Sequence, residues 1–247
     1  MSISSSLTIT YLGHSTALIT TPGGTRFLLD PWTTTNPACP PEYAAPSSLG
    51  KIDGILVTHM HSDHAGDIKP IIEANPEAQV FAIFEAAMFI GSLGAAAIQP
   101  MNIGGTVHAL GCDITMTHAE HSSSYTMASG EDIPFYYGGD PAGYVLKMED
   151  GYTIYISGDT GLFGDMALIR ELYSPTLAIL PIGDRFTMGP LQAAHAVKLL
   201  GVTHVVPVHH STFHLLTGTP HHLVQELANL GLHDVEVHAL RPGETLG

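Results

Sequence analysis

Four potential metal ligands lie within six residues of this sequence, directly after the apolar residues 54–57. They are His59, His61, Asp63 and His64. Residues two apart in an extended chain point to the same side, so His59 and His61 can converge on one ion. The turn that follows can direct the other two side chains toward a second ion. Because imidazoles and a carboxylate crowded at a strand end need a compensating charge, the spacing predicts a site for two metals.

Three later segments each place one more ligand at the end of a predicted strand. These ligands are His121, Asp159 and His209, and the strands before them are predicted over residues 112–118, 153–157 and 204–208. Four local ligands do not complete two metal sites, and three more in the same context can complete them.

This order of ligands resembles the metallo-β-lactamase superfamily. The chain carries its H-x-H-x-D-H signature at residues 59–64, then an isolated His121, Asp159 in Gly-Asp-Thr-Gly, and a last His209. Within the superfamily it is similar to small cytosolic metal-dependent hydrolases related to ascorbate-6-phosphate lactonase and to the N-acyl-phosphatidylethanolamine phospholipase D type. The similarity covers nearly the whole chain, through blocks at residues 11–15, 28–31, 120–123, 158–163, 181–190 and 207–213.

The resemblance implies a fold and a role for each ligand. The fold is the four-layer αββα sandwich, with two mixed β-sheets, outer helices and the metals at one edge between the sheets. One ion is assigned to His59, His61 and His121, the other to Asp63, His64 and His209, with Asp159 as the bridge. His118 competes with His121, but its odd offset in a strand directs it to the opposite face, and with the resemblance we favour His121.

Two further residues are placed near the metals by the same resemblance. His14 follows a strand end, where it either supports a ligand or contacts substrate, and we group it with Asp63 and Asp159 as catalytic. Asp30 matches an early Asp of the superfamily, and such carboxylates orient the imidazoles of ligands. The remaining histidines have no converging partners in the sequence and are predicted to be structural or solvent-facing: His108, His195, His204, His214, His221, His222, His233 and His238.

The expected chemistry is hydrolysis of a small ester, lactone or amide. A bridging carboxylate offsets the repulsion of two cations, and a shared hydroxide can attack the carbonyl while one metal polarises its oxygen. Zn²⁺ suits the first, His-rich site, whereas Mn²⁺ or Fe²⁺ also suits the second. Neither Cys39 nor Cys112 falls in a ligand block, which argues against a β-lactamase with a Cys ligand.

Three other functions are weighed against this one. A phosphodiesterase needs cationic help for a substrate that is already negative, and the chain offers little beyond its metals and Arg185. Di-iron oxidoreductases on this fold usually carry Glu where His61 stands, together with a flavin domain for which 247 residues leave no room. A non-catalytic metal-binding protein would be expected to have lost ligands, and all seven are present.

Contacts with substrate are predicted at three residues. Arg185 is the only Lys or Arg in an active-rim block, where it either clamps an anion or pairs with a carboxylate such as Asp184. His210 stands where the subgroup is expected to have Tyr, and Gln192 where an acidic residue is common, so substrate identity stays open. Two long loops, residues 31–50 and 122–142, exceed ordinary connections, and Tyr125 in the second follows ligand His121 toward the mouth of the site.

Composition limits the partners. The net charge is −15 with only eight Lys and Arg, so nucleic acid and anionic membranes are poor partners for a protein that binds a small-molecule substrate. No segment reaches the roughly 18 apolar residues of a membrane span, and no signal-peptide pattern opens the chain. We expect a cytoplasmic protein with one domain over residues 1–247, whose apolar-rich composition permits a homo-oligomer.

The periodicity of apolar residues and the residues that start or end helices predict the remaining strands and helices. Strands are expected at about 7–12, 15–21, 25–30, 54–57, 79–83, 112–118, 143–149, 153–157, 177–181, 204–208 and 235–238. Helices are expected at about 65–74, 85–93, 164–173, 190–200 and 220–230.

Overall fold

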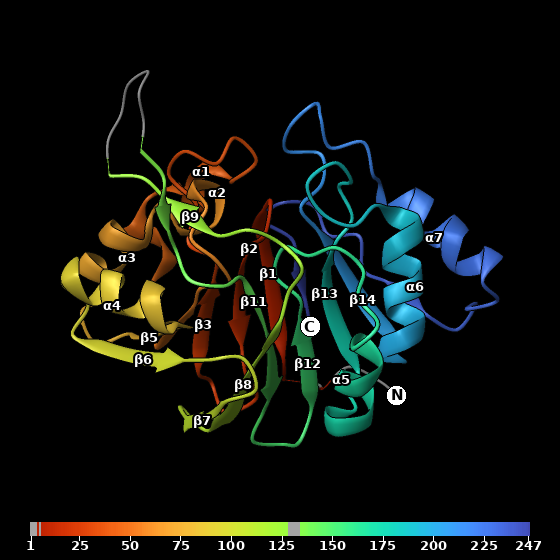
Figure 1. The fold of residues 1–247 in the computed structure, drawn as a ribbon, viewed down its shortest axis with the longest axis horizontal. Helices are drawn as coiled ribbons and strands as arrows, with labels where there is room; N and C mark the ends of the chain where they lie inside the picture. Colours follow the sequence, from red (N-terminus) through yellow and green to blue (C-terminus); the bar gives the residue numbers. More distant parts are fainter. Residues whose placement is uncertain (1–3, 5, 128–133) are drawn as a thin grey trace.

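Two seven-stranded β-sheets with helices on their outer faces form the protein (Figure 1). The structure is a computed structural model that describes residues 4, 6–127 and 134–247. In spatial order the first sheet contains β16 (Thr245–Leu246), β1 (Thr8–Gly13), β2 (Thr16–Thr20), β3 (Arg26–Leu29), β4 (Gly54–Leu56), β5 (Gln79–Ile83) and β6 (Ala97–Met101). The second contains β15 (Glu236–Val237), β14 (His204–Val208), β13 (Leu177–Pro181), β12 (Thr153–Ile156), β11 (Ala142–Lys147), β8 (Cys112–His118) and β7 (Thr106–Ala109).

Both sheets are mixed, and each carries its helices on one side. Strands β3 to β6 are parallel, as are β12 to β15, while the other neighbours are antiparallel. The longer helices are α3 (Ile68–Ala74) and α4 (Phe84–Ser92) beside the first sheet, and α5 (Met166–Tyr173), α6 (Pro190–Leu200) and α7 (Pro220–Asn229) beside the second (Figure 1). The predicted αββα sandwich is confirmed.

Side-chain alternation along β13 shows how the layers pack. Leu177 and Ile179 belong to the large core between the sheets, whereas Ala178 and Leu180 belong to the smaller core under α5, α6 and α7. A strand covered on both faces reads as a continuous apolar run, which is what residues 177–181 show.

Two contacts fix one sheet against the other near the edge that carries the ligands. The buried hydroxyl of Tyr144, on β11, donates to the carbonyl oxygens of Val57 at 2.7 Å and Phe81 at 3.0 Å. The backbone N–H of Ala142 donates to the carbonyl oxygen of Thr58 at 2.9 Å. The second sheet is thereby hydrogen-bonded directly to the segment that leads into His59.

The prediction of one continuous helix over residues 65–74 is wrong. The chain instead forms α2 (Ser62–Ala65) and α3, separated by Gly66 and Asp67. The Asp67 carboxylate accepts hydrogen bonds from the backbone N–H groups of Thr33 at 2.6 Å and Thr34 at 2.7 Å. The break thus ties the ligand-bearing turn to the first long loop, a tertiary constraint that helical periodicity does not reveal.

Other differences concern short elements in segments where no helix or strand was predicted. The structure adds β6, β7, β9 (Ser124–Tyr125), β10 (Tyr136–Tyr137), β16, α1 (Pro41–Ala44) and a 3₁₀ helix at Pro46–Leu49. Strands β9 and β10 pair as a hairpin inside the second long loop, of which residues 128–133 lie outside the described part. Gln192 accepts a 2.8 Å hydrogen bond from the backbone N–H of Gly189, so this departure from the subgroup caps α6.

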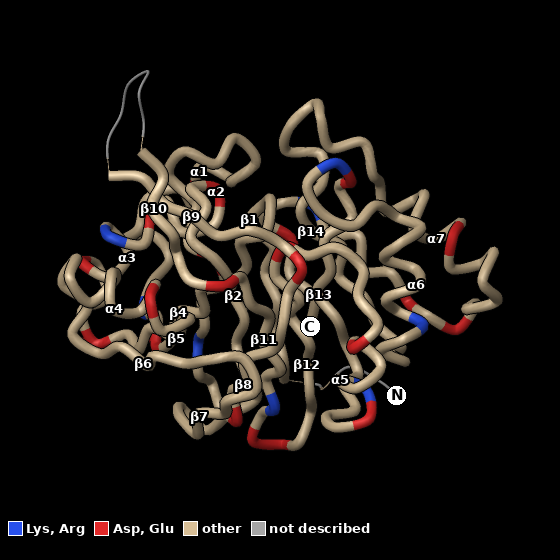
Figure 2. Tube along the Cα trace, in the orientation of Figure 1, with Lys and Arg blue, Asp and Glu red and all other residues tan. Residues whose placement is uncertain are grey.

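Charge and helix length bear on the predicted partners. Lys and Arg are spread over the trace, interspersed with acidic residues, rather than gathered in one place (Figure 2). Within the described ranges, every helix falls short of the length and apolarity needed to cross a bilayer. The cytoplasmic location and the homo-oligomer stay predictions.

Candidate metal centre

The predicted ligands converge where four strands end. Strands β8 and β12 both pair antiparallel with β11, so they run in the same direction, and β14 is parallel to β12 through β13. Their carboxyl ends therefore lie at one edge of the second sheet. The turn after β4, in the first sheet, meets them there, and the structure brings all seven predicted ligands together.

The first group consists of three histidines. Ligand atoms of His59, His61 and His121 all lie within 4.8 Å of one another. His59 Nε2 is 3.0 Å from His61 Nδ1, and the ring of His121 lies 5.0 Å from that of His59 and 5.2 Å from that of His61, centroid to centroid. Three imidazoles at this spacing suit one divalent ion with an open position.

The second group adds a histidine to the predicted set. Ligand atoms of His14, Asp63, His64 and His209 also lie within 4.8 Å of one another. His14 Nε2 is 3.1 Å from Asp63 Oδ2, and its Nδ1 is 3.1 Å from the hydroxyl of Thr212. His14 therefore lies beside the second group, as predicted, and is held from both ring nitrogens.

Asp159 lies between the two groups. Its Oδ2 is 3.0 Å from His209 Nε2, 3.2 Å from His64 Nε2 and 3.7 Å from His121 Nε2. One carboxylate oxygen thus faces both sets of imidazoles, which is the position a bridging ligand needs. The assignment of each residue to an ion stays a prediction.

The turns that carry these ligands have unusual backbone conformations. His14 and His209 have φ angles of 57° and 52°, in the left-handed region that non-glycine residues rarely occupy. The N–H of His209 donates to the carbonyl of His14 at 2.6 Å, so the two strained turns support one another. Gly158 has φ 62°, and a Cβ there would lie 2.7 Å from the carbonyl oxygen of Ala142, so glycine is required before Asp159.

Asp30 holds the second group from behind. It is buried, and its Oδ2 is 2.8 Å from His64 Nδ1. The backbone N–H and the hydroxyl of Thr58 also donate to this carboxylate, each at 2.8 Å. Because one nitrogen of His64 is held by Asp30, the other is directed at Asp159. The predicted place of Asp30 is confirmed.

The protonation states of the ligand side chains favour the binding of cations. Burial lowers the pKa of His59 well below its usual value, and burial also lowers the pKa values of His61 and His121. These three imidazoles are therefore neutral and available as ligands near pH 7. Burial alone would raise the pKa of Asp159, but its interactions with His64 and then His209 outweigh burial and hold it well below its usual range.

His64 is the exception among the imidazoles. Burial opposes its charge, but Asp159 and Asp30 outweigh burial and raise the pKa of His64 well above its usual value. Without metal, a proton on His64 therefore compensates two buried carboxylates. A divalent cation would displace that proton, because a ligating imidazole must be neutral.

Unsatisfied atoms at the same place show that the residues fit metal ions. Among the described side chains, Asp159 Oδ1 and His209 Nδ1 are buried without a hydrogen-bond partner. Buried polar atoms are nearly always satisfied, and ligation is one way to satisfy them. Together with the His and carboxylate donor set, these atoms point to first-row divalent ions such as Zn²⁺, Mn²⁺ or Fe²⁺.

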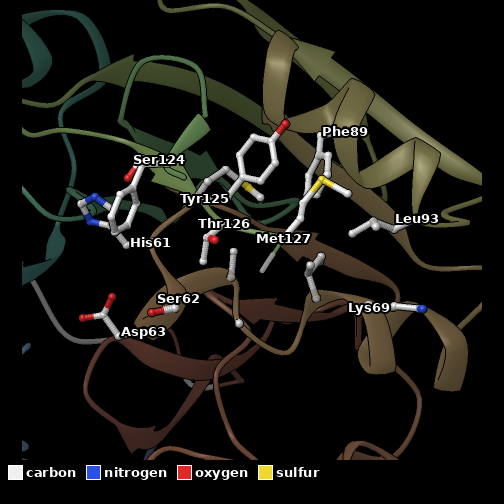
Figure 3. A pocket seen from close by; sticks show the side chains of 15 residues that line it. His61, Ser62, Asp63, Lys69, Phe89, Leu93, Ser124, Tyr125, Thr126 and Met127 are labelled. Atoms are coloured by element: carbon white, nitrogen blue, oxygen red, sulfur yellow. The ribbon is translucent and has the colours of Figure 1, made fainter. Parts of the chain in front are cut away.

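A cavity of about 530 Å³ opens beside the ligands. His61 and Asp63 line one end and Lys69 the other, with Phe89, Tyr125 and further apolar side chains between them (Figure 3). The rings of Phe89 and Tyr125 stack with centroids 4.0 Å apart. The cavity is thus charged at the metal end, apolar along its length and basic at its far end.

The three predicted substrate contacts have different outcomes. Tyr125 lines this cavity, whereas the described residues that line it do not include Arg185 or His210. The Arg185 guanidinium lies 5.6 Å from the centroid of the Phe186 ring. The ring of His210 stacks on Tyr11 at 6.4 Å, and burial lowers its pKa to about 4. The contacts themselves stay predictions.

Lys69 lines the cavity, whereas His118 lies outside the ligand groups. Lys69, which was not predicted as a site residue, lines the cavity that Arg185 does not line; the signal in the sequence was its position five residues after ligand His64. His118 is 46% exposed and lies 3.1 Å from Glu120, away from the ligand groups. His121 rather than His118 joins the cluster, as predicted.

Known proteins share this architecture and these segments. The Beta-lactamase superfamily domain family matches residues 25–210. The chain belongs to this superfamily. It also belongs to the UPF0173 family of metal-dependent hydrolases, with 47% identity over 239 residues to a member from Rubrobacter xylanophilus (97% of this chain, 96% of the relative). A member from Roseiflexus sp. is 44% identical over 241 residues (97% and 96%).

A solved structure agrees with both the sequence relation and the fold. The structure of Igni18, described as a novel metallo hydrolase from Ignicoccus hospitalis, has a TM-score of 0.84 at 35% identity and covers 97% of both chains. The predicted superfamily is therefore confirmed. The relation to the lactonase in particular stays a prediction.

Proposed function

We propose that this metal-dependent hydrolase is dinuclear and cleaves a small ester, lactone or amide. The observation that carries the proposal is the position of Asp159, whose Oδ2 lies within 3.7 Å of imidazoles from both ligand groups. When bound, two divalent ions would supply a Lewis acid for a carbonyl oxygen and would lower the pKa of a coordinated water to about 7.

Asp63 and His14 position the reacting groups at the cavity wall. The Asp63 side chain is 30% exposed and lines the cavity, while its Oδ2 is engaged by His14. Burial would raise the pKa of Asp63, but the hydrogen bond from His14 and the charge of His64 outweigh it and keep the carboxyl ionised. Asp63 Oδ1 can therefore accept a hydrogen bond from the attacking water and orient it.

The cavity favours a substrate with an apolar group beside the scissile bond. Phe89, Tyr125 and Met127 form much of its wall, and an aromatic wall suits an aryl or alkyl substituent. Phosphodiester hydrolysis would need cations near the metals, and the single Lys that lines the described cavity stands at the end opposite Asp63 (Figure 3). We therefore place a carbonyl substrate ahead of a phosphodiester.

Metal analysis joined to an activity panel tests the proposal. The purified protein should hold close to two divalent ions and hydrolyse aryl esters or lactones faster than phosphodiesters, with a rate that rises with pH near neutrality. Chelation should abolish the activity, and added Zn²⁺ or Mn²⁺ should restore it. A rate that survives complete metal removal, or activity confined to phosphodiesters, would overturn it.

A further inference from the structure

A second group of metal-ligating side chains lies outside the catalytic site, at the edge of the second sheet. It consists of His204 at the start of β14 and of Glu236 and His238 on and just after β15. His204 and His238 have no converging partners in the sequence, but in the structure they converge with Glu236. The pairing of parallel strands β14 and β15 aligns His204 with Glu236, although 32 positions separate them in the sequence.

Strand register gives the group its geometry. His204 and Glu236 are paired neighbours, and His238 follows Glu236 by two residues, so all three side chains leave the same face of the sheet. The N–H of Glu236 donates to the carbonyl of Thr203 at 2.9 Å, and that of His238 donates to the carbonyl of Val205 at 2.8 Å. The backbone therefore holds the three residues together without help from a ligand.

The donor atoms have the spacing of a metal site. His204 Nδ1 is 3.1 Å from His238 Nε2 and 3.6 Å from Glu236 Oε2. Two ligands of a tetrahedral zinc ion, each at about 2.0–2.1 Å, are about 3.3 Å apart. The two imidazoles are mostly buried, with side chains 9% and 8% exposed, while the Glu236 side chain is 65% exposed and has room to adjust.

We propose that His204, Glu236 and His238 form a peripheral site for Zn²⁺ or a similar first-row divalent ion. Two imidazoles and one carboxylate suit such ions, and the exposed side of the group leaves a fourth position to water. His204 and His209 stand at opposite ends of β14, so the site is about 16 Å from the catalytic ligands at the usual rise per residue. The two sites are therefore separate.

The site would join two parts of the fold. After β15 the chain runs on to β16, which pairs with β1 in the other sheet. An ion held by His204 on one strand and by His238 at the start of this crossing would fasten the two-residue strand β15 to β14. A ligand that binds only the folded state stabilises it, so occupancy should raise the melting temperature.

A zinc titration of the holoenzyme tests the proposal independently of the hydrolase reaction. Protein that already carries its catalytic metals is titrated with Zn²⁺ against a chromophoric chelator. The native protein should bind one more equivalent than His238→Ala, and Glu236→Gln should weaken that equivalent by about ten-fold or more. His233→Ala, which removes an exposed histidine five residues before His238 and outside the group, is the matched control and should bind as the native protein does.

Thermal unfolding gives the second readout. Zn²⁺ should raise the melting temperature of the native protein and of His233→Ala, but not that of His238→Ala. Hydrolysis by all three should be equal, because none of the changes touches the catalytic ligands. Equal zinc equivalents in the native protein and His238→Ala, or equal zinc affinity in the native protein and Glu236→Gln, would overturn the proposal, and the affinity of Glu236→Gln alone decides it if His238→Ala does not fold.

Discussion

The two ends of the cavity beside the candidate metal centre are built in different ways. At the metal end, strand ends and the turns after them hold His59, His209 and Asp159, which are buried and fixed by hydrogen bonds or close polar contacts. At the far end, helices α3 and α4 and the loop around hairpin β9–β10 supply side chains such as Met127 and Phe135, each more than 70% exposed. In our proposal the strand ends thus hold the metal site, while side chains from helices and from the loop around the hairpin form the wall that contacts the substrate.

The largest effect should come from the metal end. Asp159→Ala removes the carboxylate that faces both ligand groups, so it should lower the occupancy of both metals and reduce activity by roughly 100-fold or more. Metal content by elemental analysis, with activity on the same samples, measures this. Asp113→Ala, at an exposed Asp paired with His108, is the matched control and should keep both metals. Unchanged stoichiometry in Asp159→Ala would contradict the bridging role.

The second largest effect should come from the residue that orients a metal ligand. Asp30→Asn keeps the shape of the side chain that orients His64 but removes its charge, so metal affinity should fall by about 10- to 100-fold. Calorimetric titration of the metal-free protein in buffers of different ionisation enthalpy counts the protons released as well.

The sign of the proton release follows from the pKa of His64. Because Asp159 and Asp30 raise that pKa well above its usual value, the metal-free native protein carries the proton at pH 7 and must release it on binding. Metal affinity should therefore fall as pH decreases. Asp30→Asn lowers the pKa of His64 and should release fewer protons at pH 7. Equal proton release from both proteins would show that His64 is neutral before metal binds.

The same contrast explains what the sequence could predict. Ligands at the metal end lie in the turns that directly follow strands, so the sequence locates them: His118 ends β8 and lies outside the ligand groups, whereas His121, in the turn after β8, joins them. The far end depends on contacts between distant segments. Lys69 lines the cavity from the start of α3, which begins after the break at Gly66 and Asp67, and the Asp67 carboxylate accepts hydrogen bonds from backbone N–H groups of the first long loop. Likewise, His204 and His238 converge only through strand pairing.

The apolar wall should affect substrate binding more than turnover. Phe89→Ala removes a ring that lines the cavity and stacks on Tyr125, so it should raise KM about ten-fold for esters with an aryl or long alkyl group. The effect on a short acetyl ester should be small. Phe84→Ala, on the same helix but outside the described lining, is the matched control. A loss of kcat with unchanged KM would mean that the cavity is not the substrate site.

The smallest effect should come from the basic residue at the far end. Lys69 is exposed, so its attraction for a distal carboxylate on the substrate is screened by water, and Lys69→Met should raise KM for such substrates by up to about five-fold. Neutral substrates of the same length should be unaffected, because the methylene stem is largely kept. Arg185→Met is the matched comparison, since Arg185 was the cation expected at the active rim yet does not line the described cavity. The same KM measurements on both variants compare the two positions directly. If Arg185→Met, and not Lys69→Met, discriminates against anionic substrates, then the substrate leaves the metals toward Arg185, and the cavity in Figure 3 lies on the wrong side of the reacting bond.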